Sequence, residues 1–450
     1  MKTLTNFPYQ HVLVLGLAKS GTAAANLLLN SNIKVRVNDA NVDPEDPVVK
    51  DLEKKGATVI TGSHPISVLE NIDLIVKNPG IPYSNVILEE AIRRNIPIIT
   101  EIELAARLAQ NNELIGVTGS NGKTTTTTLI YEILKASDQP VKLAGNIGIV
   151  ATDVAQTLEE KDKLLVELSS FQLMGVETFR PHIAALLNLY EAHIDYHESV
   201  ENYVRAKMNV FMQQTEEDFL VYNADDPKVK EVVQHCKATL VPFSTKETLS
   251  NGAMIDNGTI YFKGEEIISL KNVVLVGEHN YENILAAIAV ALLSGATKEG
   301  IRKVLTTFSG VKHRLQYVTT INGRLFYNDS KATNILATQK ALKSFEQPVI
   351  LLAGGLDRGD EYDSLLPFVK HVKAMVLFGE TAKKLAAFAK KAKIEEVRIV
   401  KDVQEAAKVA YDLSKEGDVI LLSPACASWD QYKTFEERGD MFIQAVHILA

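Results

Sequence analysis

Short apolar runs rich in Val and Ile alternate with helical patterns through most of the chain, and this alternation limits the fold more than any other feature. The first example is an apolar run at 11–15, a helical pattern at 21–30 and a second apolar run at 34–38. A buried strand, a helix and another buried strand in succession are typical of a parallel sheet with crossover helices. The chain is therefore predicted to have an α/β fold.

Three such series follow one another. The second begins at 114–118 and contains runs at 164–168, 183–189 and 219–223, and the third starts near residue 310 with runs at 348–353, 374–378 and 419–423. Between them, residues 253–268 have a hairpin pattern with turns at Asn257-Gly258 and Lys263-Gly264. At about 150 residues per domain, we expect a Rossmann-like domain at 1–105, a central P-loop ATPase-type parallel sheet with a small antiparallel annex at 106–310, and a Rossmann-like domain at 311–450.

Charge and hydropathy exclude some classes of partner. The net charge of -8 argues against nucleic acid, because phosphate backbones are bound by clustered Lys and Arg. The most apolar stretch, 284–293, is about half as long as the ~20 residues that a membrane-spanning helix needs. The N-terminus lacks the pattern of a signal peptide, and two cysteines cannot form a disulfide framework. We therefore expect a cytoplasmic protein without membrane insertion.

The run TGSNGKTT at 118–125 is the strongest motif. A strand that leads through small residues into a helix directs backbone N–H groups at one point, where an anion is stabilised. Lys123 adds a positive charge, and the Thr124 hydroxyl is placed to bind magnesium. The usual phosphate loop would have glycine at 117, where this chain has Val117, so the loop is a variant. The alternative is a glycine turn that only joins strand to helix. The predicted nucleotide-binding residues here are Gly119, Ser120, Asn121, Gly122, Lys123, Thr124 and Thr125.

A second glycine turn, GLAKSG at 16–21, is a weaker signal. Ala18 replaces the middle glycine that lets a backbone approach a pyrophosphate in dinucleotide-binding folds. Asp39 ends the next strand, where its carboxylate could bind a ribose hydroxyl. The alternative is that Gly16 and Gly21 serve close packing of helix on strand. The turn does not predict NAD.

Further motifs, read with the phosphate loop, resemble the Mur ligase family. They cover nearly the whole chain in the family's order: GNIG at 145–148, ELSSFQ at 167–172, HID at 193–195, GEHNYEN at 277–283, HR at 313–314, NDSKATN at 328–334 and SPACASWDQYKTFEERG at 423–439. ELSSFQ and SPACAS are most similar to the members that add D-glutamate.

The resemblance implies three domains, which bind a UDP-sugar, ATP and an amino acid in that order along the chain. It implies an ATP-dependent ligase of peptidoglycan precursor synthesis that adds D-glutamate to UDP-N-acetylmuramoyl-L-alanine. The acceptor carboxylate would first be phosphorylated, and the amine would then displace phosphate. ATP and two Mg²⁺ ions are the implied cofactors. We expect a monomer whose partners are small-molecule substrates.

The resemblance also assigns a catalytic and metal-binding set. Glu167 closes a buried apolar run, where a carboxylate is unfavourable unless it is paired or bound to metal. His193 would be a second metal ligand, although a buried core histidine is the commoner case. Lys207 would be carbamylated and so present a carboxylate to metal, whereas a solvated lysine is the simpler expectation. The implied catalytic residues are Lys123, Glu167, His193 and Lys207, and the implied metal ligands are Thr124, Glu167, His193 and Lys207.

Binding residues are assigned in the same way. For ATP, the resemblance adds Asn280, Asn283, Arg314 and Asp329. For D-glutamate, it implies Lys331, Thr333, Arg358, Ser428, Trp429 and Phe435. Arg358 stands where some members have lysine, and Trp429 where some have leucine. For the UDP-sugar, the candidates are Lys19, Ser20, Asp39, Asn78, Gly80 and Asn146, several of which would suit turns for their backbone geometry alone.

Three other functions are kept as alternatives. One is another ATP-dependent ligase of the same superfamily, such as folylpolyglutamate synthase. A second is a nucleotide-binding switch that hydrolyses ATP only to change shape. The third is an oxidoreductase that uses the first glycine turn.

Overall fold

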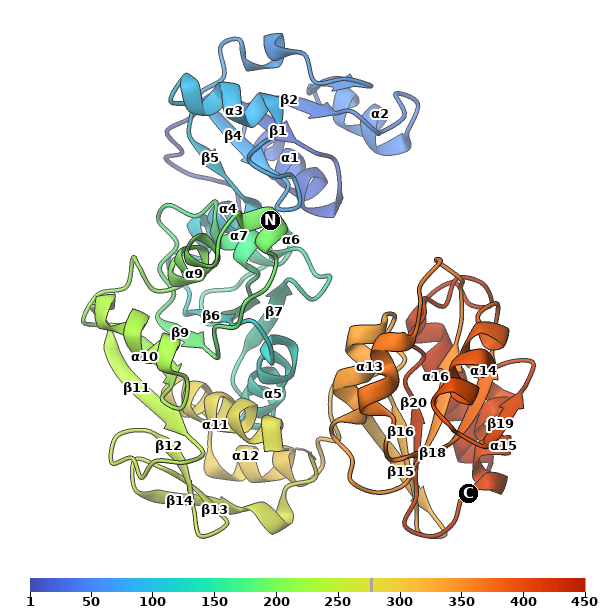
Figure 1. Cartoon of the computed structure of the whole chain (residues 1–450). Coiled ribbons are helices and arrows are strands. Elements are labelled where there is room, and N and C mark those ends of the chain that lie inside the picture. The colour runs from blue at the N-terminus through green and yellow to red at the C-terminus, as the bar shows by residue number, and fades with distance from the viewer. Residues whose placement is uncertain (276–277, 450) are drawn as a thin grey trace. The chain divides into compact units, whose positions relative to one another are not determined.

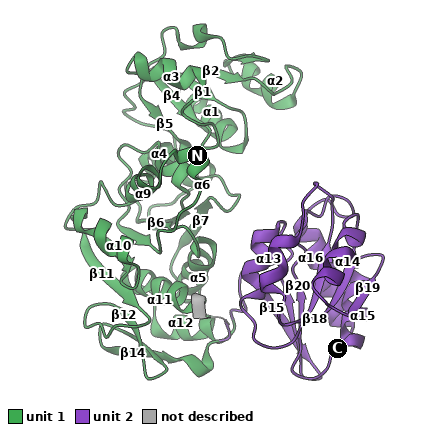
Figure 2. Cartoon of the chain, in the orientation of Figure 1, with its two compact units in different colours: residues 1–273, 278–307 green, residues 274–277, 308–450 purple. Residues whose placement is uncertain are grey.

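Three sheets form the framework of the protein. The computed structural model describes residues 1–275 and 278–449, without the side chains of Glu278 and His279. Their contacts divide the chain into two compact units (Figure 2). Unit 1 comprises residues 1–273 and 278–307, and unit 2 is formed mainly by residues 308–450. The expected α/β class is confirmed, whereas the predicted domain boundary near residue 105 lies within unit 1 and stays a prediction.

The first sheet of unit 1 is entirely parallel, with the strand order β3-β2-β1-β4-β5 (Figure 1). Alternate residues of β1 enter different cores: Val12 and Val14 pack on one face, and Leu13 and Leu15 pack on the other. The strands are β1 (His11–Leu15), β2 (Lys34–Asp39), β3 (Thr58–Thr61), β4 (Leu74–Lys77) and β5 (Ile98–Ile99). The helices are α1 (Lys19–Asn30), α2 (Pro47–Lys54), η1 (Ile66–Leu69), α3 (Val86–Arg93) and α4 (Glu101–Leu108).

The second sheet of unit 1 has nine strands in the order β14-β13-β12-β11-β10-β9-β6-β8-β7. The pairs from β7 to β12 are parallel. These strands are β6 (Leu114–Thr118), β7 (Val141–Gly145), β8 (Lys163–Glu167), β9 (Ile183–Leu186), β10 (Phe219–Asn223), β11 (Thr239–Ser244) and β12 (Ala253–Asp256). The expected runs at 11–15, 114–118 and 219–223 agree with β1, β6 and β10. The run at 183–189 was too long, since β9 ends at Leu186.

The predicted antiparallel annex is confirmed and extends the same sheet. β13 (Thr259–Phe262) pairs antiparallel with β12 and with β14 (Glu265–Ser269). Both turns have positive φ at both central residues: 45° and 74° at Asn257-Gly258, and 50° and 80° at Lys263-Gly264. These are the signs of a type I′ hairpin turn, which matches the twist of the strands it joins.

The helices of the nine-stranded sheet bring distant parts of the sequence together. Helix α11 packs against α5 and against β9 to β12, so residues near 283 reach the turn that precedes α5 (Figure 1). The helices are α5 (Lys123–Ala136), α6 (Ala151–Ala155), α7 (Ser170–Leu173), α8 (Ile194–His197), α9 (Val200–Met208), α10 (Pro227–Val232), η2 (Val233–His235), η3 (Leu270–Asn272), α11 (Glu278–Leu293) and α12 (Lys298–Leu305).

Unit 2 contains a six-stranded sheet in the order β15-β16-β20-β17-β18-β19, in which only the β15–β16 pair is antiparallel. Val349 and Leu351 of β17 pack on the face covered by α13 and α14, and Ile350 and Leu352 on the face covered by α15 and α16. The strands are β15 (Gln316–Ile321), β16 (Arg324–Asn328), β17 (Val349–Gly354), β18 (Val372–Phe378), β19 (Glu396–Ile399) and β20 (Val419–Leu422). The helices are α13 (Ile335–Leu342), η4 (Asp363–Phe368), α14 (Ala382–Lys391), α15 (Val403–Leu413) and α16 (Phe435–Ile448).

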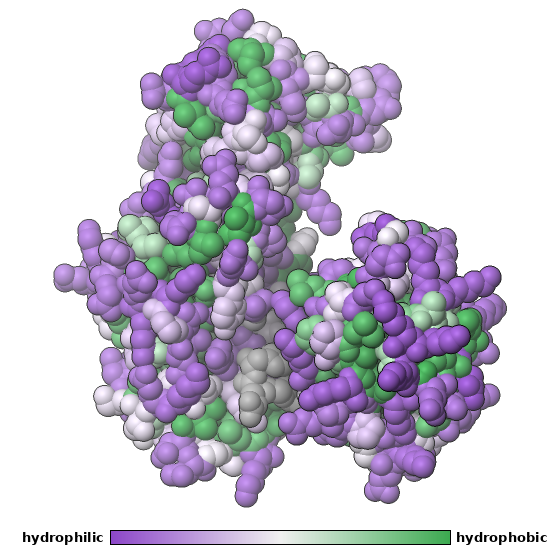
Figure 3. Space-filling view, in the orientation of Figure 1, coloured by the Kyte–Doolittle hydropathy of each residue, from purple (hydrophilic) through white to green (hydrophobic). Residues whose placement is uncertain are grey.

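The surface is mostly polar. On the face shown in Figure 3, hydrophilic residues predominate over both units, and hydrophobic residues are scattered among the hydrophilic ones in small groups. None of the helices in the described part of the chain is long and apolar enough to cross a membrane.

Candidate active site

The predicted phosphate loop lies between β6 and α5, at the carboxyl end of the parallel strands. Gly122 caps α5 with a φ of +81°, a conformation that favours glycine. A Cβ atom at this position would lie 2.1 Å from Oδ1 of Asn283, so helix α11 closes directly over the turn. Asn283 and Asn280 are both buried, and the Asn283 amide donates to Oδ1 of Asn280 at 3.1 Å. Thr124 and Thr125 lie in the first turn of α5.

Neighbouring segments hold the loop in place. The Ser120 hydroxyl lies 2.7 Å from the hydroxyl of Tyr203 and accepts a hydrogen bond from the backbone N–H of Tyr190 at 2.9 Å. The Asn188 side chain accepts from the backbone N–H of Asn121 at 2.8 Å and donates to its carbonyl at 3.2 Å. The loop therefore has one fixed shape, as a preformed anion site requires.

Two lysine amines meet at the loop. Lys123 Nζ donates to the Gly119 carbonyl at 2.8 Å, and Lys207 Nζ donates to the same oxygen at 2.9 Å. Lys207 comes from α9 and is only 2% exposed. Burial, followed by the charge of Lys123, lowers the pKa of Lys207 well below its usual value, and Glu167 opposes this effect. Two lysine amines thus converge on one point at the mouth of the loop.

Glu167 ends β8 beside β6 and is only 1% exposed. Its Oε1 accepts a hydrogen bond from the Asn146 amide at 3.1 Å, whereas its Oε2 has no hydrogen-bond partner among the described residues. A buried carboxylate oxygen without a partner is unfavourable. This oxygen is therefore suited to a cation.

His193 lies at the start of α8, with a φ of +55°. Its ring meets Phe171 of α7 edge-on, with 5.0 Å between the ring centroids, and the residue is exposed rather than part of the core. The alternative that His193 is a buried core histidine is therefore wrong, and its role as a metal ligand stays a prediction. Among the residues that the structure describes, no three His, Cys, Asp or Glu side chains gather closely enough to hold a metal ion.

The first glycine turn is held by the protein's own groups. The Asp39 carboxylate accepts hydrogen bonds from the backbone N–H groups of Leu17 at 2.7 Å and Asn41 at 2.8 Å. A Cβ atom on Gly21 would lie 1.8 Å from the Gly16 carbonyl oxygen, so this glycine allows α1 to pack against the end of β1. Gly21 therefore serves the close packing of helix on strand that was the alternative for these glycines.

The remaining sugar-nucleotide candidates lie at this turn and at the loop after β4. The Asn78 amide donates to the Ser20 hydroxyl at 3.1 Å, and Asn78 Oδ1 accepts from the Gly80 N–H at 3.1 Å. Lys19 is exposed at the start of α1. Asn146 is apart from these residues, bound to Glu167.

The candidate residues of unit 2 cluster around the carboxyl ends of β16 and β20. Asp329 follows β16, and its carboxylate accepts from the Ser423 hydroxyl at 2.8 Å and from the Leu315 N–H at 3.0 Å. Burial raises the pKa of Asp329 to about 7. Arg314 lies close enough to oppose that shift.

The predicted D-glutamate residues pair within unit 2. The Lys331 amine lies 5.6 Å from the centroid of the Phe435 ring, and the Arg358 guanidinium lies 4.8 Å from that of Trp429. Trp429 is 65% exposed. The buried Ser428 hydroxyl has no hydrogen-bond partner in the described part of the chain. The Thr333 N–H donates to the Lys331 carbonyl at 2.8 Å.

Two buried cations escaped the sequence analysis. Arg438 of α16 is fully buried and donates to the carbonyls of Ser330 at 2.9 Å and Cys426 at 3.1 Å. Lys77, the last residue of β4, is 1% exposed. A charged residue that closes an apolar run was the signal used for Glu167, and it applies equally to Lys77. Arg438 carries no comparable signal. Of the GEHNYEN motif, Gly277 lies outside the described residues.

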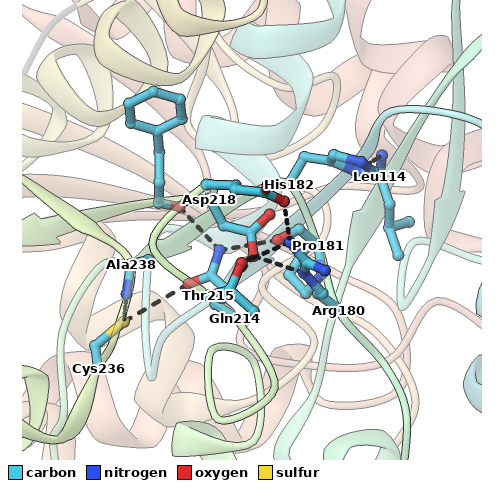
Figure 4. Close-up of polar contacts among 11 residues, drawn as sticks. Leu114, Arg180, Pro181, His182, Gln214, Thr215, Asp218, Cys236 and Ala238 are labelled. Carbon is cyan, nitrogen blue, oxygen red and sulfur yellow. Dashed lines mark hydrogen bonds and ion pairs between the residues drawn. The ribbon is translucent and has the colours of Figure 1, made fainter.

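A separate hollow of about 370 Å³ lies at the opposite, amino ends of β6, β9 and β10. Figure 4 shows that its polar groups bond to one another: Arg180 pairs with Asp218 at 2.7 Å, and the Leu114 N–H donates to Nδ1 of His182 at 3.2 Å. Gln214 donates to the Pro181 carbonyl at 2.9 Å. Because parallel sheets bind ligands at their carboxyl ends, this hollow is not part of the candidate active site.

Comparison with known families covers most of the chain. A model described as Mur ligase MurD-like, N-terminal domain, matches residues 10–100, the Mur ligase middle domain matches 117–291, and the Mur ligase, glutamate ligase domain matches 313–426. The chain is 61% identical to a UDP-N-acetylmuramoylalanine–D-glutamate ligase of Oceanobacillus iheyensis, with 100% of both chains covered. It is 56% identical to the enzyme of the same name from Bacillus subtilis, with 98% of both covered.

Solved structures agree on the fold. A UDP-N-acetylmuramate–alanine ligase of Thermotoga maritima is similar with a TM-score of 0.54 at 18% identity, over 98% of this chain and 100% of that one. A MurF ligase of the same organism, in complex with ADP, is similar with a TM-score of 0.57 at 18% identity, over 93% and 96%. At this identity, the likeness concerns the fold alone.

Proposed function

This chain belongs to the Mur ligase family, and we propose that it is the ATP-dependent ligase that joins D-glutamate to UDP-N-acetylmuramoyl-L-alanine in peptidoglycan precursor synthesis. The relatives of that name cover the chain from end to end. One observation carries the chemistry: the amines of Lys123 and Lys207 meet at the Gly119 carbonyl, close to the partnerless Oε2 of Glu167.

The reaction needs activation because a free carboxylate is a poor electrophile. A carboxylate oxygen of the acceptor attacks the γ-phosphorus of ATP, and ADP leaves with the electrons of the broken P–O bond. The D-glutamate amine then attacks the carbonyl carbon of the acyl phosphate, an amide bond forms, and inorganic phosphate leaves. The amine loses a proton in this step.

Unit 1 supplies the groups that bind the transferred phosphoryl group. The N–H groups at the start of α5 and the Lys123 amine would bind the ATP phosphates, and Lys207 or its carbamate would lie beside them. Ser120 and Asn121 keep the loop in shape through Tyr203 and Asn188. Asn280, Asn283, Arg314 and Asp329 are the further residues proposed to contact the nucleotide.

The residues present fit a magnesium site. Magnesium is usually held by one or two carboxylates together with phosphate oxygens and water, so a dense protein cage is not required. Glu167, with its partnerless Oε2, and the Thr124 hydroxyl would hold one ion, and His193 and carbamylated Lys207 would hold a second. Such ions neutralise charge on the phosphates. Burial lowers the pKa of Lys207, and this raises the share of the neutral amine, which is the form that reacts with carbon dioxide.

The substrates that flank ATP are assigned to two further groups of residues. The D-glutamate carboxylates would bind to Lys331, Thr333, Arg358 and Ser428, with Trp429 and Phe435 as walls. The UDP-sugar would bind to Lys19, Ser20, Asp39, Asn78, Gly80 and Asn146. We further propose a cytoplasmic monomer that binds neither nucleic acid nor membranes. Domain boundaries near 105 and 310 would separate the three binding regions.

Release of phosphate tests this function against its alternatives. We expect release only when ATP, UDP-N-acetylmuramoyl-L-alanine and D-glutamate are all present, with one amide formed for each phosphate. Phosphate release at the same rate without the two substrates would favour a nucleotide switch. Use of folate acceptors or L-glutamate would favour another ligase of the superfamily, and NAD binding would favour an oxidoreductase.

A further inference from the structure

Lys77 is a buried amine at the carboxyl end of β4. Its Nζ lies within hydrogen-bonding distance of the Asn78 carbonyl at 3.3 Å, the Pro79 carbonyl at 3.2 Å and the Tyr196 hydroxyl at 3.2 Å. Among the described residues, no carboxylate pairs with it. Its environment instead contains the ring of Tyr83, whose centroid is 5.0 Å from Nζ, and that of Tyr196 at 6.0 Å.

Such an environment disfavours a charged amine. Burial lowers the pKa of Lys77 to about 7. Carbonyl dipoles and aromatic faces compensate only part of the hydration that a buried ammonium group loses. An apolar side chain of the same length would therefore suit this position better in the folded protein, and the amine calls for an explanation other than stability.

The loop that Lys77 contacts borders the ligand-binding edge of the first sheet. The order β3-β2-β1-β4-β5 reverses direction between β1 and β4, and ligands bind outside the carboxyl ends of strands at such a point. Asn78 spans this edge, because its amide donates to Ser20 at the start of α1. The Cβ atom of Asn78 would lie only 3.0 Å from a Cβ atom on Gly16.

Tyr196 joins this loop to the nine-stranded sheet. Its hydroxyl oxygen lies 2.8 Å from the Pro79 carbonyl and 2.9 Å from the Ile81 carbonyl, which share its single proton, and it accepts a hydrogen bond from Lys77. Tyr196 belongs to α8, the helix that His193 precedes, and the Phe171 ring packs against both residues, at 4.4 Å from Tyr196 and 5.0 Å from His193. One residue thus connects the edge of the first sheet to the segment that carries His193.

We propose that Lys77 is a positioning residue of the sugar-nucleotide site, whose amine and the Tyr196 hydroxyl together hold the Asn78–Gly80 loop against α8. This inference rests on the proposed function, which makes that loop part of the UDP-sugar site. Lys77 is too deeply buried to touch the substrate itself. It acts by keeping Asn78 and Gly80 where the substrate meets them.

Two nearly isosteric variants test the proposal in the full chain. Lys77→Met removes the amine and keeps the stem, and Tyr196→Phe removes the hydroxyl and keeps the ring. We expect each to raise the KM for UDP-N-acetylmuramoyl-L-alanine about tenfold, as for loss of a hydrogen bond to a charged group, with the KM for ATP and kcat changed less than about twofold. The double variant should raise this KM by less than the product of the two single increases, because the two residues act through one contact.

Thermal unfolding separates positioning from plain structural support. Lys77→Met should unfold at the same temperature as the wild type or higher, because a buried charge is removed. A lower unfolding temperature together with an unchanged KM for the sugar nucleotide would overturn the proposal, and so would equal increases in the KM for ATP and the sugar nucleotide.

Lys135 and Tyr131 provide a matched control on α5. The Lys135 amine lies 5.2 Å from the Tyr131 ring centroid, so this pair has the same cation–π contact, but at the surface. Lys135→Met and Tyr131→Phe should leave all KM values within about twofold, as surface changes usually do. If the wild type does not consume UDP-N-acetylmuramoyl-L-alanine at all, the proposed function fails; if it does and Lys77→Met has wild-type kinetics, only the role of Lys77 fails.

Discussion

Unit 1 contains two turns of the same plan, one between β1 and α1 and one between β6 and α5, and each is accompanied by a buried lysine. In the first, the Asp39 carboxylate binds the N–H of Leu17, and Lys77 binds carbonyls and the hydroxyl of Tyr196. In the second, Lys123 and Lys207 converge on the Gly119 carbonyl beside Glu167. The first turn is held by hydrogen bonds to the protein's own side chains, whereas two lysine amines and a carboxylate meet at the second.

The difference shows what each glycine turn is built for. A site for several phosphate groups requires positive charge and metal-binding oxygen at one point, and the second turn has both. In the first turn the protein supplies a negative charge of its own, because the Asp39 carboxylate accepts a hydrogen bond from the Leu17 N–H. Under the proposed function, Ser20 and Asn78 would bind the sugar nucleotide together with Asp39.

The largest expected effect comes from comparing the lysines of the two turns. Lys123→Ala should lower phosphate release at least about a hundredfold, because a cation at the transferred phosphoryl group is lost. Lys19→Ala should instead raise the KM for the sugar nucleotide without a comparable loss of kcat. Steady-state kinetics measures both, and thermal unfolding checks that Lys123→Ala is folded. Equal losses of kcat in the two variants would contradict the division of roles.

Lys207 should show the next largest effect. Lys207→Ala is expected to lower kcat about a hundredfold, a loss typical of removing one electrostatic group from an active site. If its carbamate supplies a carboxylate, added acetate or formate should restore part of the activity. The same acids added to Lys123→Ala, which lacks an amine and not a carboxylate, provide the control. Full activity of Lys207→Ala, or absence of rescue, would remove the carbamate from the site.

Alanine substitutions of a glycine in each turn should have different effects, on stability in the first turn and on the KM for ATP in the second. Gly21→Ala places a Cβ atom 1.8 Å from the Gly16 carbonyl oxygen, a backbone atom that cannot move alone, and should destabilise the protein by about 2–3 kcal/mol. Gly122→Ala meets the Asn283 side chain, which can turn away, so it should mainly raise the KM for ATP.

Gly62 is a control that separates the effect of backbone strain from the effect of the contact between Gly122 and Asn283. Gly62 has a φ of +78° with open space around it, and Gly62→Ala should therefore cost only about 1–2 kcal/mol from the left-handed conformation. If Gly122→Ala affects the KM for ATP no more than Gly62→Ala does, the contact with Asn283 has no part in nucleotide binding.

Local sequence patterns predicted the strands that lead into both turns, but not the contacts around those turns. Strands such as β6 follow from local apolar runs, and Glu167 was recognisable because a carboxylate closes such a run. The meeting of Gly122 with Asn283, or of Lys77 with Tyr196, depends on how elements far apart in sequence pack, and no local pattern encodes that. Roles in unit 2 likewise came from motif resemblance, since Asp329 and Ser423 are ordinary polar residues until the sheet brings them together.

The two buried lysines should differ in how their contribution to the free energy of unfolding changes with pH. The pKa of Lys77 is about 7 in the folded protein and near the usual 10.5 when unfolded, so folding disfavours its protonated form. The resulting cost is complete below about pH 7, and it decreases as pH rises toward 10.5. The groups that face Lys77 keep a constant charge between pH 6 and 9: burial raises the pKa of Tyr83 to about 12 and that of Tyr196 further, and burial lowers that of His197 to about 4.

Lys77→Met should therefore stabilise the protein by ~2 kcal/mol at pH 6, as for replacement of a buried charge by an apolar side chain, and by clearly less at pH 9. Lys207→Met provides the contrast, because the Lys207 amine donates to the Gly119 carbonyl and lies near the buried Glu167 carboxylate, and loss of both interactions should destabilise the protein at both values. Thermal unfolding of the three proteins at pH 6 and pH 9 measures these differences. A gain for Lys77→Met that is equal at both pH values would mean that the amine keeps its proton in the folded state up to pH 9, so that burial does not lower its pKa, and the contrast between the two turns would then lie in their ligands alone.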